Sequence, residues 1–111
     1  MLARINRLPK EAIGRLLVGG SILANKTVVV YSAFTKQNIR FVIVVGKKVA
    51  KLSTIRNRLK KVSRHCLCNL LNKIKAGDYA IVLKPIASQI ETKALIESLQ
   101  SIMANYKIAQ K

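Results

Sequence analysis

Residues 46–65 read Gly46-Lys-Lys-Val-Ala-Lys-Leu-Ser-Thr-Ile-Arg-Asn-Arg-Leu-Lys-Lys-Val-Ser-Arg-His65, and this stretch decides how the rest of the chain is arranged. It holds eight Lys and Arg residues and no acid. Either Ser53 or Thr54 can cap a helix, and helical periodicity then continues to about Ile74. The apolar stripe at this spacing comprises Ile55, Leu59, Val62, Cys66 and Leu70. The pattern predicts a long helix with one edge packed on a core and cations elsewhere.

The cations of this helix form two groups. Arg56, Lys60 and Arg64 are one turn apart and span roughly 12 Å at the helical rise per residue. On the other side of the apolar stripe lie Arg58, Lys61 and His65. Arginine offers a planar fork for phosphate oxygens and lysine a compact mobile charge, and Asn57 adds a neutral donor and acceptor. A solvated basic face is the alternative interpretation of this pattern.

Upstream of this helix we expect one helix and two strands. Pro9 and Glu11 suit a first helical turn, and Gly19-Gly20 can end that helix. Residues 27–31 and 39–45 are β-branched and apolar, which is typical of strands. Lys36-Gln37-Asn38 is the expected turn, and pairing of the two strands as a hairpin is the economical arrangement.

Downstream, Gly77-Asp78 is expected to end the long helix. Residues 79–83 are largely apolar, as in a strand at the centre of a sheet, and Pro85 stops that strand. Residues 91–106 predict a last helix whose buried face is Leu95, Leu99, Ile102 and Met103. The order is helix, strand, strand, helix, strand, helix. It predicts an α+β fold, a two-layer sandwich of helices on a small mixed sheet, formed by residues 1–111 as one domain.

Charge narrows the class of partner. The chain has 21 Lys and Arg against 4 Asp and Glu, a net charge of +17. Such a field favours a polyanion, and nucleic acid is the usual one. A generally basic protein and an anionic membrane surface are the rivals, although folded-domain patterns argue against an interfacial helix. Basic residues interrupt the first 20 positions and no apolar run is long enough to span a membrane. We therefore expect a cytoplasmic protein with no membrane partner and no small-molecule substrate.

Neither a metal site nor polypeptide catalysis is expected. His65, Cys66 and Cys68 suggest zinc ligands, but adjacent and i+2 residues of a helix point in different directions, and a closed site needs about four ligands. Two cysteines this close do not form an easy disulfide. The acids Glu11, Asp78, Glu91 and Glu97 are scattered, whereas metal-dependent nucleases cluster carboxylates. We predict no catalytic residue in the polypeptide.

The central segment Arg56-Asn57-Arg58-Leu59-Lys60-Lys61-Val62-Ser63-Arg64 resembles the signature helix of the bacterial ribonuclease P protein family. The run Gly46-Lys47-Lys48-Val49-Ala50-Lys51 resembles the family's upstream lysine segment. Flanking resemblances occur at Asn6-Arg7-Leu8, Ala24-Asn25-Lys26, residues 78–84 and Glu97-Ser98-Leu99. Together they cover most of the chain.

The resemblance implies a fold and a division of labour. The fold is ferredoxin-like, or similar to the second domain of a small-subunit ribosomal protein, with the signature helix in a left-handed crossover between parallel strands. In that family a catalytic RNA with bound Mg²⁺ removes the 5′ leader of precursor tRNA, so the resemblance implies that the chain is part of an endoribonuclease holoenzyme and does not cleave by itself. The residues implied to bind the RNA subunit are Lys47, Lys48, Lys51, Arg56, Asn57, Arg58, Lys60, Lys61 and Arg64.

The family also implies a groove for the single-stranded leader between the first helix and the sheet. The leader residues inferred here are Tyr31, Ile13, Leu17 and Lys84. The family usually has aromatic side chains where this chain has Ile13 and Leu17, and for these two plain core packing is the stronger interpretation. Half-buried strand packing is the alternative for Tyr31. Lys84 stands where an arginine is common, and His65 where an acid often stands.

Two further classes of nucleic-acid-binding protein are alternatives. The first is a small basic structural protein of another ribonucleoprotein, of the ribosomal type, which would share the charge and the α+β pattern. The Arg-Asn-Arg helix with its upstream lysines is what separates the ribonuclease P protein family from this alternative. A DNA-binding helix-turn-helix protein would need a short turn between paired helices, which this sequence does not contain.

Overall fold

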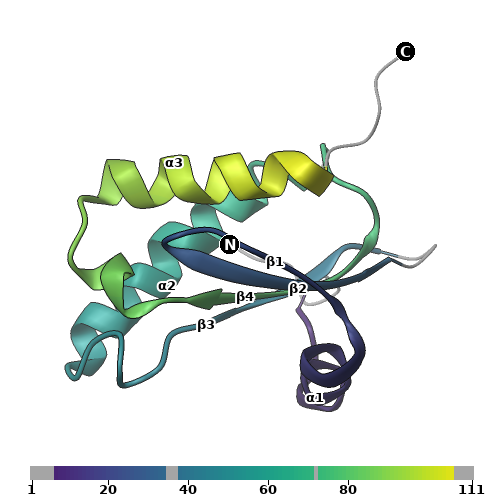
Figure 1. The fold of residues 1–111 in the computed structure, drawn as a ribbon, viewed down its shortest axis with the longest axis horizontal. Helices are drawn as coiled ribbons and strands as arrows, with labels where there is room; N and C mark the ends of the chain where they lie inside the picture. The colour runs from purple at the N-terminus through teal and green to yellow at the C-terminus, as the bar shows by residue number, and fades with distance from the viewer. Residues whose placement is uncertain (1–6, 35–37, 72, 107–111) are drawn as a thin grey trace.

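The computed structural model describes residues 7–34, 38–71 and 73–106. Figure 1 shows its helices and strands; three strands follow the first helix before the second helix begins. They are α1 (Lys10–Gly19), β1 (Ser21–Ala24), β2 (Val28–Phe34), β3 (Arg40–Val44), α2 (Ser53–Cys68), β4 (Gly77–Leu83) and α3 (Thr92–Met103), with short 3-10 turns η2 (Pro85–Ser88) and η3 (Ala104–Tyr106). The predicted α+β class is confirmed.

The four strands form one mixed sheet in the order β1-β2-β4-β3. β4 pairs antiparallel with β2 and parallel with β3. The hairpin predicted between residues 27–31 and 39–45 is therefore wrong, because β4 lies between the two strands. The reason is burial: Tyr79, Ala80 and Ile81 are fully buried, and the central position covers both faces of such a strand. The predicted turn at residues 36–38 lies mostly outside the described residues.

The strand β1 was not expected from the sequence. Its sequence, Ser21-Ile22-Leu23-Ala24, does not alternate apolar and polar residues as a half-buried strand does, and all four residues are exposed. A Cβ at Gly20 would lie 2.6 Å from the carbonyl oxygen of Leu16, so a glycine lets β1 begin directly after α1. At the other end, the Asn25 side chain accepts hydrogen bonds from the amides of Thr27 and Val28 at 2.8 and 2.9 Å, which turns the chain into β2.

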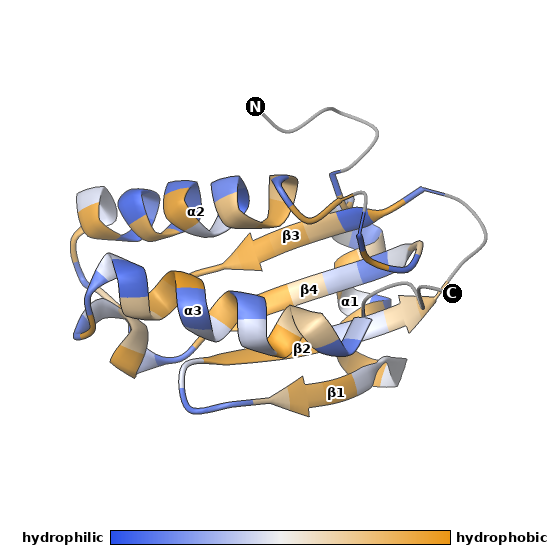
Figure 2. Cartoon of the chain, turned by 90° about the horizontal axis from the view of Figure 1, so that it is seen from above, coloured by the Kyte–Doolittle hydropathy of each residue, from blue (hydrophilic) through white to orange (hydrophobic). Residues whose placement is uncertain are grey.

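The helix α2 connects β3 to the parallel neighbour β4. Figure 2 looks onto the sheet from the side of α2 and α3. When β3 and β4 are turned to point upward in that view, β4 lies to the left of β3. The crossover is left-handed, as the family resemblance implied and against the general rule for such units.

Helices cover the two faces of the sheet unequally. α2 and α3 pack on one face, and α1 lies on the other (Figure 1). The larger core includes Val30, Ile81, Leu67 and Leu99. The smaller core, beneath α1, holds Leu8, Ala12, Leu16 and Ala80. The predicted two-layer arrangement matches the face of the sheet that α2 and α3 cover. On the opposite face, α1 covers part of the sheet.

The boundaries of α2 differ from those expected. The helix ends at Cys68 rather than near residue 74, and Leu52, not Ser53 or Thr54, is the N-cap, with no side-chain cap. Its buried residues are Leu59, Ser63, Cys66 and Leu67, while Ile55, Val62 and Leu70 are half-buried. The apolar stripe is thus rotated toward Ser63. Gly77-Asp78 belongs to β4 instead of ending the helix.

The last helix follows the sequence pattern more closely. Its predicted buried face of Leu95, Leu99, Ile102 and Met103 is confirmed. Tyr106 continues that face from the 3-10 turn and packs edge-on against Tyr79, with the ring centroids 5.2 Å apart. The Tyr79 hydroxyl donates to the Lys75 carbonyl at 2.6 Å, so the segment after α2 is fastened beneath the end of α3.

Candidate nucleic-acid interface

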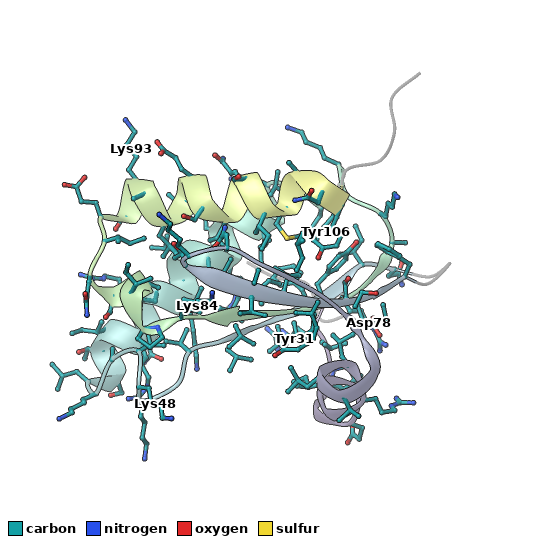
Figure 3. All side chains as sticks on the ribbon, viewed as in Figure 1. Tyr31, Lys48, Asp78, Lys84, Lys93 and Tyr106 are labelled. Atoms are coloured by element: carbon teal, nitrogen blue, oxygen red, sulfur yellow. The ribbon has the colours of Figure 1, made fainter. Side chains whose placement is uncertain are left out.

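The connection between β3 and α2 is a basic loop held in place by Arg56. Lys47, Lys48 and Lys51 are exposed on it, and Figure 3 shows Lys48 pointing away from the fold. The Arg56 guanidinium donates to the carbonyl oxygens of Ala50 and Lys51 at 2.9 and 2.8 Å. Arg56 therefore fixes the loop on the first turn of α2 in addition to supplying charge.

The remaining signature residues lie on two sides of α2. Asn57, Arg58 and Lys61 are exposed and available to a partner. Lys60, half-buried, and Arg64, exposed, lie on the side that faces β3. The α2 N-terminus has no side-chain cap and no acid in its first turn, so its leading amides add partial positive charge to the surface.

Lys60 and Arg64 line a groove of about 520 Å³ together with Arg7, Leu8 and three residues of β3, which are Phe41, Val42 and Ile43. Arg7 forms a parallel β-bridge with Phe41, and the Leu8 amide donates to the Phe41 carbonyl at 3.2 Å. The short segment before α1 thus brings a third cation to the α2 surface. Arg7 was not among the sequence-predicted site residues, although it belongs to one of the flanking resemblances, Asn6-Arg7-Leu8.

The acids lie away from this surface. Glu11 is on α1, while Glu91 and Glu97 belong to the start and middle of α3. Asp78 accepts from Arg40 Nε and Nη2, both at 2.9 Å, and this pairing raises the pKa of Arg40. The basic loop, α2 and Arg7 together form a surface without a carboxylate, which we call the α2 basic surface. Such a surface concentrates polyanions.

The structure brings only some of the predicted leader residues together. Ile13 and Tyr31 pack into the same small cluster beneath α1, joined by Val42. Leu17 follows one turn after Ile13 and is 41% exposed, so the core interpretation is wrong for Leu17. Of the two α1 positions, Ile13 packs in the cluster that contains Tyr31.

Lys84 lies elsewhere. It follows β4 by one residue, four positions beyond Ala80, the partner of Tyr31, which is about 13 Å along a strand. Its amine donates to the Asn25 carbonyl at 2.6 Å. Figure 3 shows Lys84 and Tyr31 at different places along the sheet. The hydrogen bond from Lys84 to Asn25 stabilises the turn between β1 and β2.

The cysteines are arranged for packing. Cys66 is buried in the main core and Cys68 is half-buried, both as free thiols. Burial raises the pKa of the Cys66 thiol, which disfavours the thiolate that a metal requires. Within residues 7–34, 38–71 and 73–106, no three His, Cys, Asp or Glu side chains gather at one point. In the same part of the chain, no helix is long and apolar enough to cross a bilayer.

Comparison with known proteins decides the family. The model of the ribonuclease P protein family matches residues 3–107, nearly the whole chain. The chain belongs to the ribonuclease P protein family. A ribonuclease P protein component from Lactobacillus delbrueckii is 34% identical over 83 residues, which cover 72% of this chain and 69% of the relative. One from Pseudanabaena is 36% identical over 70 residues, 62% of this chain and 60% of that relative.

Solved ribonuclease P proteins share the fold. The protein from Staphylococcus aureus superposes with a TM-score of 0.83 at 26% identity, over 90% of this chain and 94% of that one. The protein from Thermotoga maritima has a TM-score of 0.80 at 22% identity, over 92% and 98% of the two chains. The fold that contains the left-handed crossover and α2 is therefore shared with solved ribonuclease P proteins.

Proposed function

We propose that this chain is the protein subunit of ribonuclease P, which binds a catalytic RNA through the α2 basic surface and assists removal of the 5′ leader from precursor tRNA. The observation that carries the proposal is the coincidence of the family's signature segment with one acid-free surface. Lys47, Lys48 and Lys51 are held beside α2 by Arg56, and Arg7 extends the charge across the groove.

In this proposal the RNA performs the chemistry with its bound Mg²⁺, and the polypeptide contributes binding. The cations of α2 neutralise phosphates that would otherwise need diffuse metal ions. The scattered acids of the described chain are unsuited to holding a pair of catalytic ions. The holoenzyme is therefore the endoribonuclease, acting in the cytoplasm on precursor tRNA.

The leader is proposed to lie along the sheet beside α1. Tyr31 is half-buried there with Ile13, and Leu17 remains open to solvent. One aromatic ring gives a stacking surface for a base, and the two aliphatic side chains give apolar contact without stacking. Lys84 is not needed for this contact because its amine is engaged at the Asn25 carbonyl.

A precursor-tRNA cleavage assay at low Mg²⁺ tests the proposal. The RNA would be the ribonuclease P RNA of the same genome, with and without the full chain, and the chain alone as a control. We expect release of the leader to depend on the protein at low Mg²⁺ and no cleavage by protein alone. Folded protein that leaves cleavage unchanged would contradict the proposal.

A structural role in another ribonucleoprotein, such as a ribosomal particle, is not favoured. Charge and the α+β architecture suit such a role equally, but the family model covers residues 3–107. The same assay separates the two, because a ribosomal-type protein has no reason to lower the Mg²⁺ requirement of leader removal.

A further inference from the structure

We propose that the groove between Arg7, β3 and α2 receives one unpaired nucleobase of the RNA bound by the α2 basic surface. This inference rests on the proposed function and adds a specific contact to it. Phosphate binding alone accounts for exposed cations such as Arg58 and Lys61. It does not account for a hollow of about 520 Å³ that lies between three of the cations and the edge of a sheet.

The groove has the mixed lining that a base requires. Its rim carries Arg7, Lys60 and Arg64, and its floor is formed by Leu8 and the edge of β3. Pockets of 300–1,000 Å³ with mainly apolar linings and few polar groups are typical of small-ligand sites, and a single nucleotide falls in that size class. Unstacked bases of RNA are the elements that proteins bind in such hollows.

The edge of β3 offers backbone groups to the edge of a base. The Phe41 carbonyl points away from β4, since it accepts from the Leu8 amide. Backbone groups of a strand alternate between its two sides, so the N–H and C=O of Ile43 also point away from β4. Among the described residues no backbone hydrogen bond joins these two groups to the segment before α1. In the register of the Arg7–Phe41 bridge, the amide that would reach the Ile43 carbonyl is that of Lys10, which already begins α1. One donor and one acceptor therefore face the groove side by side.

This pair of groups matches a nucleobase better than it matches the other candidates. Every base carries a donor and an acceptor next to each other on its Watson–Crick edge. An extended peptide would need a longer run of free edge than remains, because Arg7 already bridges Phe41. The cations on the rim fit the phosphates on either side of an extruded nucleotide.

Amide NMR of the full chain with adenosine 5′-monophosphate tests the site, with ribose 5-phosphate as the matched ligand that lacks the base. We expect the nucleotide to shift the Ile43 amide saturably and to bind at least about threefold more tightly than ribose 5-phosphate. Arg7→Ala should weaken the nucleotide by a similar factor. Arg15→Ala, which removes an exposed cation of α1 outside the groove, should not.

Equal shifts from both ligands, or an Ile43 amide that does not respond, would overturn the inference. A response of Ile43 to a poly-glutamate peptide in place of the nucleotide would also overturn it, and would make the groove a peptide site. The cleavage assay is independent of these outcomes. A chain that supports leader removal but fails the NMR test keeps its proposed function and loses the base site.

Discussion

Arg56 has two roles in the proposed interface, because its guanidinium donates to two loop carbonyls and its charge belongs to the α2 basic surface. We expect Arg56→Ala to weaken binding of the ribonuclease P RNA by about 1–3 kcal/mol, through loss of both the charge and the loop position. Arg56→Lys should restore only part of this, since the lysine side chain is one atom shorter than the arginine side chain whose Nη1 donates to both carbonyls. RNA affinity and the NMR shifts of residues 47–51 would be measured.

The matched control is Arg58→Ala, which removes an exposed charge from the same helix. It should leave the shifts of residues 47–51 in place while still lowering affinity. If Arg56→Ala also left those shifts unchanged, the loop would not depend on Arg56.

Tyr31 carries the aromatic contribution to the proposed leader site. Stacking of one base on an aromatic side chain contributes about 1–3 kcal/mol, so Tyr31→Ala should lower affinity for substrates with long leaders by that amount. Substrates with a minimal leader should be bound as before. Affinities of the holoenzyme for two such substrates measure the effect, and an equal loss on both would remove Tyr31 from the leader site.

Tyr79 provides a prediction about pH. Burial, and the neighbouring Tyr106, raise the pKa of Tyr79 to about 12, against about 10 for an unfolded tyrosine. Between these values the unfolded chain holds fewer protons than the folded one, so this residue's contribution to stability is full below about pH 10 and falls as pH rises toward 12. In a tyrosinate absorbance titration of folded protein, Tyr79→Phe should remove the step near pH 12. A step that remains would place that pKa on another tyrosine.

At the scale of elements, α2 carries a polar residue in the middle of its buried face. Ser63 is fully buried and its hydroxyl has no hydrogen-bond partner among the residues that the structure describes, which costs stability. We expect Ser63→Ala to raise the free energy of unfolding by about 1 kcal/mol, as measured by urea denaturation. Ser63→Val, which adds volume, should lower it by about 1–3 kcal/mol. A loss of stability in the alanine variant would mean that the hydroxyl is satisfied.

The sequence predicted elements better than it predicted their pairing. α3 and its buried face were predictable because Leu95, Leu99, Ile102 and Met103 follow one helical period. The pairing of β4 with both β2 and β3 was not, since strand order depends on burial of residues far apart in the chain. The end of α2 at Cys68 was missed because Leu70 and Leu71 continue its apolar pattern while packing from a turn.

The candidate site, like the fold, was only partly predictable from the sequence. The cations of residues 47–64 were identified because they are contiguous in sequence and share one element. Arg7 and the backbone groups of Ile43 were missed, since they lie beside α2 only because the segment before α1 pairs with β3. Lys84 was assigned to the leader on a resemblance, and its hydrogen bond to Asn25 is a tertiary contact that no local pattern reveals.

At the scale of the whole molecule, the net charge of +17 predicts that the proposed binding of RNA depends strongly on salt. Each RNA phosphate neutralised by a lysine or arginine releases counterions, so log K should fall by about 0.7–0.9 per log unit of salt for each such contact. If Arg7, Lys60 and Arg64 bind phosphates together with the loop lysines, the slope of log K against log salt concentration should correspond to several phosphate contacts. It should decrease by about one contact when one of these residues is replaced by alanine. Replacement of Arg15 should leave the slope unchanged because α1 lies on the opposite face of the sheet from α2. A slope near zero in the unmodified chain would contradict binding through the α2 basic surface, because apolar contacts alone show little dependence on salt.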